Sequence, residues 1–258
     1  MHITDFKMDF TDKITLNWIN NDPYMTVIFN ALSIGLPVGE RMFMIAIKEH
    51  LPKITNANLR QQCSIFINQE MNHATMHKAY NKAFCQYNQL SLESLEKPFR
   101  DAFEQLAKTN TAQFRLATTV AIEHLTAITS HMYLEYLREQ YKMPPELKQF
   151  WSWHCQEELD HRAVAFDVYM QIYSDRAYLN QIFEQTTKDI LNLYKLTAFA
   201  IIVRSRANIK LFRNWLEHET LLTHKNGIYQ YFQESFANFK SESFHPTSYF
   251  GSLKLNFS

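Results

Sequence analysis

Glutamate and histidine recur in the sequence at a spacing that suits metal binding. Glu70 and His73 lie three residues apart, and Glu158 and His161 repeat this Glu-x-x-His spacing later in the chain. On a helix, residues three apart share a face, so each pair can present one carboxylate and one imidazole to a neighbouring helix. One such pair arises often by chance, whereas two copies indicate a common site.

A further glutamate precedes each pair, Glu40 before the first and Glu123 before the second. Ferritin-like four-helix bundles use this set, with one glutamate from each of two helices and Glu-x-x-His from each of the other two. Four carboxylates offset the charge of two divalent ions and leave positions open for water, dioxygen or substrate. Oxygen ligands with a little nitrogen favour iron, with manganese or zinc as alternatives. The pattern predicts two divalent metal ions bridged by Glu70 and Glu158.

Simpler interpretations exist for the two single glutamates. Glu40 follows Gly39 and could be a first-turn acid that stabilises the N-terminus of a helix. Glu123 lies in LATTVAIEHLTAITSH, which is apolar or small for a turn on each side. An ionised acid in such surroundings is costly unless it is paired or bound to a metal. Glu123 is therefore the stronger indication of a ligand.

Three more residues lie near the pairs. His154, four residues before Glu158, is predicted as a ligand that makes one ion richer in nitrogen, with hydrogen bonding beside a ligand as the alternative. His77 lies one turn beyond His73, where it would line the cavity or support a ligand. Glu157 is rotated by about 100° from Glu158 on a helix and would lie outside the ligand shell. In a hydrolase, His77 and Glu157 are the candidate catalytic residues for proton transfer.

The elements that must position these residues read as long helices. Helical patterns cover residues 24–50, 57–87, 111–141, 145–173 and 179–207, with a shorter one at 211–220 and an extended tail at 243–258. SIGLPVGER, residues 33–41, predicts a kink or a restart at Pro37. The polar segment 88–100 is the candidate crossover between two helical hairpins.

These patterns predict an all-α fold with a ferritin-like four-helix bundle core and additional C-terminal helices. The chain of 258 residues contains only 4 Gly and 7 Pro, fewer than turn-rich β folds need. We expect a single domain, 1–258, with the metal-binding bundle at about 24–173 and accessory helices and tail at about 177–258.

Charge and composition exclude several classes of partner. Lys+Arg and Asp+Glu both number 26, so no net charge favours nucleic acid. The three cysteines lack a Cys-x-x-Cys spacing, and the charged N-terminus does not resemble a signal peptide, so we expect reduced thiols and a cytoplasmic location. LTAFAIIV, 196–203, is far shorter than the about 20 residues that span a bilayer, and no transmembrane segment is predicted. The 20 Phe and 13 Tyr would allow a helical homodimer interface.

Four stretches form a recognisable set of motifs: NALSIGLPVGERMF, FINQEMNHATMHKAYN, WHCQEELDHRAVAFDVY and the Phe-His-Pro of residues 244–246. In these motifs the sequence resembles the bacterial family of predicted metal-dependent hydrolases. The resemblance implies functional roles for positions that match the family motifs: Glu40, Glu70, His73, His77, His154, Glu157, Glu158 and His161. Leu36 and Arg162 depart from the family pattern, which usually has Phe and Lys there, and neither is a proposed ligand.

The order of the ligands also resembles that of di-iron arylamine N-oxygenases, whose extra histidine matches His154. On this ligand pattern we expect an oxidoreductase that activates dioxygen to oxidise a small organic substrate. The alternative is a hydrolase in which the metal ions activate water. Metal storage or a structural metal centre is the least favoured function.

Overall fold

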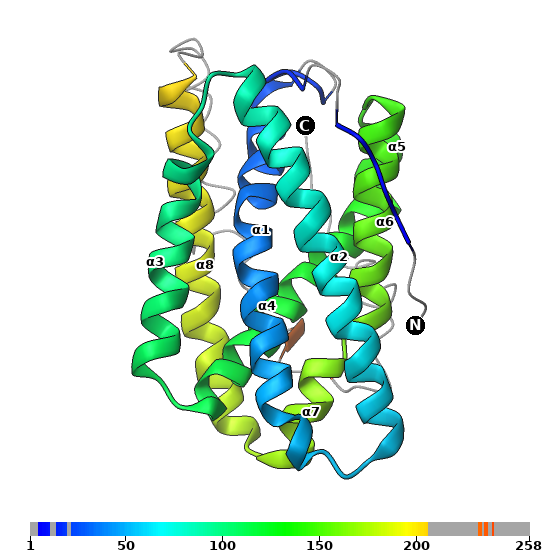
Figure 1. The fold of residues 1–258 in the computed structure, drawn as a ribbon, viewed down its shortest axis with the longest axis vertical. Helices are drawn as coiled ribbons and strands as arrows, with labels where there is room; N and C mark the ends of the chain where they lie inside the picture. Colours follow the sequence, from blue (N-terminus) through cyan, green and yellow to red (C-terminus); the bar gives the residue numbers. More distant parts are fainter. Residues whose placement is uncertain are drawn as a thin grey trace.

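The computed structural model describes residues 5–10, 14–19, 22–205, 232–233, 235–236 and 239. Every regular element in this part of the chain is a helix, and none of its residues lies in a strand. The long helices pack lengthwise as one bundle (Figure 1): α1 (Pro23–His50), α2 (Ala57–Tyr87), α3 (Leu92–Thr109), α4 (Ala112–Met132), α6 (Pro145–His161) and α8 (Arg176–Arg204). The predicted all-α bundle is confirmed.

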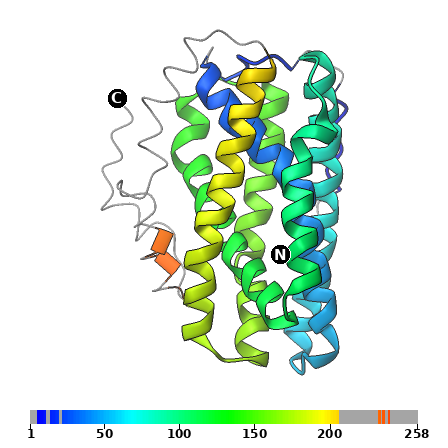
Figure 2. The same ribbon diagram turned by 90° about the vertical axis from the view of Figure 1, so that its left-hand side faces the viewer.

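Helices α1, α2, α4 and α6 form the core of the bundle. Helix α1 packs against α2, and α4 packs against α6, while α1 also contacts α4 and α2 contacts α6. Helix α8 lies against α1 and α4 and runs the length of the bundle (Figure 2), and α3 lies against α1 and α8. The core helices are therefore covered on one side by α3 and α8.

Short helical elements connect the long ones. They are η1 (Leu51–Lys53), the π-helix η2 (Tyr133–Leu137), α5 (Arg138–Gln140) and α7 (Val164–Ile172). The predicted helix 111–141 corresponds to α4, η2 and α5 together, and the predicted helix 145–173 is divided into α6 and α7 by a turn at 162–163. The predicted helix 211–220, the tail 243–258 and the Phe-His-Pro motif lie outside the described residues.

Local signals in the sequence explain where most helices begin. A side-chain oxygen of the residue before the helix accepts a hydrogen bond from a backbone N–H of the first turn, which otherwise has no partner. The capping residues of α1, α2, α3, α4 and α8 are Asp22, Asn56, Ser91, Thr111 and Asp175. Helix α6 instead begins with Pro145, whose missing N–H costs nothing at that position.

The crossover predicted at 88–100 is largely helical, because α3 begins within it. Ser91 Oγ accepts a hydrogen bond from the backbone N–H of Ser94 and caps the helix. Apolar residues at helical spacing then face the bundle and are buried: Leu95, Phe99 and Phe103. The polar and Pro-containing composition concealed this stripe, and burial of the stripe outweighed the unfavourable Pro98 inside the helix.

The predicted restart at Pro37 is wrong, because α1 is continuous through SIGLPVGER. Pro37 has no backbone N–H, so the carbonyl of Ser33 one turn earlier loses its helical partner. The side-chain amide of Asn81 on α2 donates to that carbonyl at 2.7 Å, and Ser33 Oγ donates to Asn81 Oδ1 at 2.6 Å. A side chain of the neighbouring helix thus supplies the hydrogen bond that the Ser33 carbonyl lacks within α1. No pattern within α1 could reveal this contact.

Gly35 is a point of close approach between α1, α3 and α8. A Cβ atom on Gly35 would lie 2.7 Å from ring atoms of both Phe99 on α3 and Tyr194 on α8. The same atom on Gly39, one turn later, would be no closer than 3.5 Å to its nearest neighbour, Phe43. The first glycine is therefore required by packing between helices, although its sequence context suggested a break.

Residues Pro23–Lys53 form a helix long and apolar enough to cross a membrane by length and composition. Of its most apolar window, 61% is buried inside the bundle. Core helices of globular proteins pass the same test, and this helix carries Glu40, which is fully buried. Its burial against the other helices accounts for its apolar character.

We predict opposite effects for alanine at the two glycines of α1. Gly35→Ala should lower the free energy of unfolding by about 1–3 kcal/mol, because two buried rings must move. Gly39→Ala is the matched control and should raise it by about 0.5–1 kcal/mol, because alanine favours a helix. Urea denaturation followed by circular dichroism measures both. Equal effects of the two substitutions would contradict the close approach at Gly35.

Candidate metal centre

The interior of the bundle brings together all seven residues predicted as metal ligands. They come from the four core helices: Glu40 from α1, Glu70 and His73 from α2, Glu123 from α4, and His154, Glu158 and His161 from α6. None of them is more than 3% exposed. Residues far apart in the sequence therefore share one buried site, as their helical spacing predicted.

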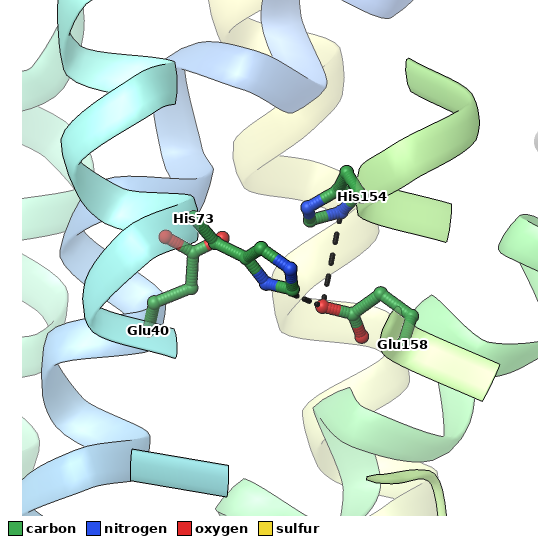
Figure 3. Close-up of side chains that lie close together, drawn as sticks. All are labelled: Glu40, His73, His154 and Glu158. Atoms are coloured by element: carbon green, nitrogen blue, oxygen red, sulfur yellow. Dashed lines mark ion pairs between the residues drawn. The ribbon is translucent and has the colours of Figure 1, made fainter. Parts of the chain in front are cut away.

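The ligand atoms form two groups, and the atoms of each group lie within 4.8 Å of one another. The first group consists of Glu40, His73, His154 and Glu158 (Figure 3). The second group consists of Glu70, Glu123 and His161. Each Glu-x-x-His pair is thus divided between the groups, because the histidine of one helix joins the glutamate of the other.

Two glutamates contact imidazoles of both groups. Glu158 Oε1 lies 3.4 Å from Nδ1 of His73, and Glu158 Oε2 lies 3.6 Å from Nε2 of His161. Glu70 Oε1 lies 3.0 Å from Nε2 of His161 and 3.9 Å from Nδ1 of His73. Carboxylates that bridge two ions would occupy such positions, which is the role that the sequence predicted for both residues.

Many atoms that face the two groups have no hydrogen-bond partner. These atoms are both carboxylate oxygens of Glu40, Glu70 and Glu123, Nδ1 of His73 and Nε2 of His161. Buried polar atoms in proteins are nearly always hydrogen-bonded. Glu70 and Glu123 instead share ion-pair contacts with one atom, Nε2 of His161, at 3.0 Å and 3.4 Å, and one imidazole cannot compensate two buried carboxylates. Divalent cations would satisfy these atoms, so the residues present fit a pair of metal ions.

The carboxylates are crowded enough to perturb one another. Burial raises the pKa of Glu40 and of Glu123 well above the usual range, and the neighbouring carboxylates of Glu70 and Glu158 raise it further. Burial also raises the pKa of Glu70. Four carboxylates in this space cannot all ionise unless cations compensate their charge.

The imidazoles of the Glu-x-x-His pairs supply part of that compensation. Burial lowers the pKa of His161, but Glu70 and Glu158 outweigh burial and hold it well above its usual value. Burial likewise lowers the pKa of His73, but the hydrogen-bonded carboxylate of Glu157 and the nearby carboxylate of Glu158 raise it to about 9. Protons on the two rings can therefore balance the carboxylates when no metal ion does.

Each of these imidazoles is also held from outside the two groups. Nε2 of His73 lies 3.1 Å from a carboxylate oxygen of Glu157, and Nδ1 of His161 lies 3.1 Å from the amide oxygen of Gln69. Glu157 therefore contacts the ring nitrogen of the predicted ligand His73 that faces away from the two groups. Gln69 is a site residue that the spacing of acids and histidines did not predict, although it directly precedes Glu70 as Glu157 directly precedes Glu158.

His77 lies beside the first group and belongs to neither group. It is fully buried, and its Nδ1 lies 2.8 Å from Ser33 Oγ. Because that hydroxyl donates to Asn81, the ring donates its Nδ1–H to Ser33. Nε2 is then an acceptor without a hydrogen-bond partner, and the ring centroid lies 4.7 Å from that of His154.

The motifs that carry these residues match a known family. The model of the family described as predicted metal-dependent hydrolases matches residues 2–249, nearly the whole chain. The chain belongs to this family. The resemblance inferred from its motifs is confirmed, and the description implies an enzyme that depends on metal. No curated protein and no solved structure matches the chain significantly.

We predict that loss of one carboxylate lowers the metal content of this family member. Glu123→Ala should reduce it from about two ions per chain to about one, and Glu158→Ala should reduce it further because that residue contacts both groups. Glu146→Ala on the exposed start of α6 is the control. Metal analysis after dialysis measures the content, and full occupancy in both variants would contradict the ligand assignment.

Metal uptake should release protons. Glu40, Glu123, His73 and His161 have raised pKa values without metal, so they hold protons to higher pH than ordinary groups of their kind, whereas ligands must be deprotonated to bind. Affinity should therefore rise with pH. Calorimetry in buffers of different ionisation enthalpy counts the released protons, and zero release at about pH 7 would contradict the proposed competition.

Proposed function

We propose that this protein is a hydrolase that holds two divalent metal ions between α1, α2, α4 and α6. The observation that carries the proposal is the pair of adjacent, fully buried ligand groups that share contacts to Glu70 and Glu158. The family description supports hydrolysis. Bound ions would lower the pKa of a water molecule and polarise an ester, amide or phosphoryl group.

The chain's own residues supply orientation and a dry environment. Trp153 packs edge-on against His73 at 4.9 Å between ring centroids, and Phe66 packs in the same way against His161 at 4.8 Å. These contacts, together with the hydrogen bonds to Glu157 and Gln69, fix both ring planes. Exclusion of water strengthens every electrostatic interaction in the site. The depth of the ligands favours a small substrate.

His77 is the candidate proton acceptor beside the first group. Burial, together with His154 and His73, lowers its pKa well below the usual value, so the ring is neutral. Its Nε2 has no hydrogen-bond partner and could accept a proton from the reacting water. The low pKa makes the ring a weak base, so the transfer would depend on bound ions lowering the pKa of that water. Glu157 instead acts through His73 and is a positioning residue in this proposal.

Oxidation of a small organic substrate with dioxygen is the second candidate function. One observation favours it: the two groups combine four carboxylates with three imidazoles, an oxygen-rich set with some nitrogen that suits iron. The same set would serve either reaction, so the metal that gives activity and the need for dioxygen separate the two.

Anaerobic assays test the proposal. Metal-free protein is loaded with Mn²⁺, Zn²⁺ or Fe²⁺ under nitrogen and offered p-nitrophenyl esters, a p-nitroanilide and bis(p-nitrophenyl) phosphate. We expect hydrolysis without dioxygen that falls at least about 100-fold in Glu158→Ala and is unchanged in Glu146→Ala. Absence of hydrolysis, together with dioxygen consumption and a new visible absorption band after Fe²⁺ loading, would replace hydrolysis with the oxidative function.

A further inference from the structure

On both α2 and α6, the residue before the glutamate of the Glu-x-x-His pair hydrogen-bonds to the histidine of the other helix. Gln69 precedes Glu70 on α2, and its side chain contacts His161 on α6 at 3.1 Å. Glu157 occupies the equivalent position on α6 and contacts His73 on α2, also at 3.1 Å. Gln69 and Glu157 are only 1% and 3% exposed, so water does not weaken either contact.

The two supports differ in charge. Glu157 offers His73 a carboxylate, whereas Gln69 offers His161 a neutral amide oxygen. An imidazole that donates its outer N–H to a carboxylate is a stronger metal ligand, because the hydrogen bond is charge-assisted and raises the basicity of the ring. His73 is therefore expected to be a stronger metal ligand than His161.

The number of ligands differs in the same direction. The first group has four residues with two imidazoles, and the second has three residues with one imidazole. If Glu70 and Glu158 bridge, the first position has five protein ligands and the second has four, so the second has more room for water or substrate. The charge of the supporting residue and the number of ligands both favour tight binding of a metal ion by the first group. They favour weaker binding and exchange of water or substrate at the second group.

We propose that Gln69 and Glu157 make the two metal positions unequal, so that the first group fills before the second and the second position receives the substrate or the reacting water. This inference rests on the metal centre of the proposed function but not on the reaction. Both residues are positioning residues, because they contact ligand side chains and belong to neither ligand group. A swap of amide and carboxylate between them should move the affinities in opposite directions.

Titration of the metal-free protein with Zn²⁺ in a calorimeter tests the inference. The wild-type protein should bind two ions in two steps, the first at least about 10-fold tighter. Glu157→Gln should weaken the first step by about 10- to 100-fold and leave the second in place. Gln69→Glu should instead strengthen the second step by a similar factor. Glu146→Gln on the surface of α6 should change neither step.

Distinct outcomes separate the two proposals. Two equal steps in the wild-type protein, or unchanged steps in both variants with native circular dichroism and melting temperature, would overturn the inference and leave the metal centre intact. Absence of any Zn²⁺ binding would overturn the proposed function itself. If Glu157→Gln does not fold, Gln69→Glu decides alone, because an unchanged second step in that variant would overturn the inference.

Discussion

Burial of four carboxylates between α1, α2, α4 and α6 is the constraint on which the rest of the site depends. An ionised carboxylate inside a protein is costly unless cations or hydrogen bonds compensate it. Here most of the carboxylate oxygens that face the centre have no hydrogen-bond partner. Without metal, the raised pKa values of His73 and His161 favour protonated rings, and those of Glu40 and Glu123 favour neutral carboxyls, so protons reduce the net charge. With metal, the ions would do so, and their binding free energy would stabilise the fold.

The packing of the surrounding helices must hold the buried carboxylates in place, although these carboxylates add little to the stability of the fold. Helix α1 achieves this through two unusual positions. Gly35 lets Phe99 and Tyr194 approach its backbone, and Pro37 frees a carbonyl that Asn81 then binds. That link ties α1 to α2 two turns before Glu40. The hydroxyl of Ser33 hydrogen-bonds to both Asn81 and His77. The contact between α1 and α2 and the surroundings of the first group therefore belong to one hydrogen-bonded network.

The site has an approximate internal symmetry that relates α2 to α6, and the two helices differ at positions that affect metal binding. Helices α2 and α6 both carry a polar residue, a glutamate and a histidine in the same order. Helix α6 adds His154, and its polar residue is charged where that of α2 is neutral. Repetition produces two adjacent positions, and the departures from repetition distinguish them. In the proposed hydrolase, this difference would let one ion hold its place while the other exchanges water for substrate.

The sequence by itself determined the residue types and much of the secondary structure. Helical period and the repeated Glu-x-x-His spacing are local, so they predicted α2 at its observed bounds and the ligands that the bundle brings together. Only the tertiary structure decided how the ligands divide, because that depends on which side chains of different helices meet. It paired His73 with Glu158, gave Gln69 a partner on α6 and made the polar crossover a helix. Each of these depends on contacts between residues far apart in the chain, which no local pattern encodes.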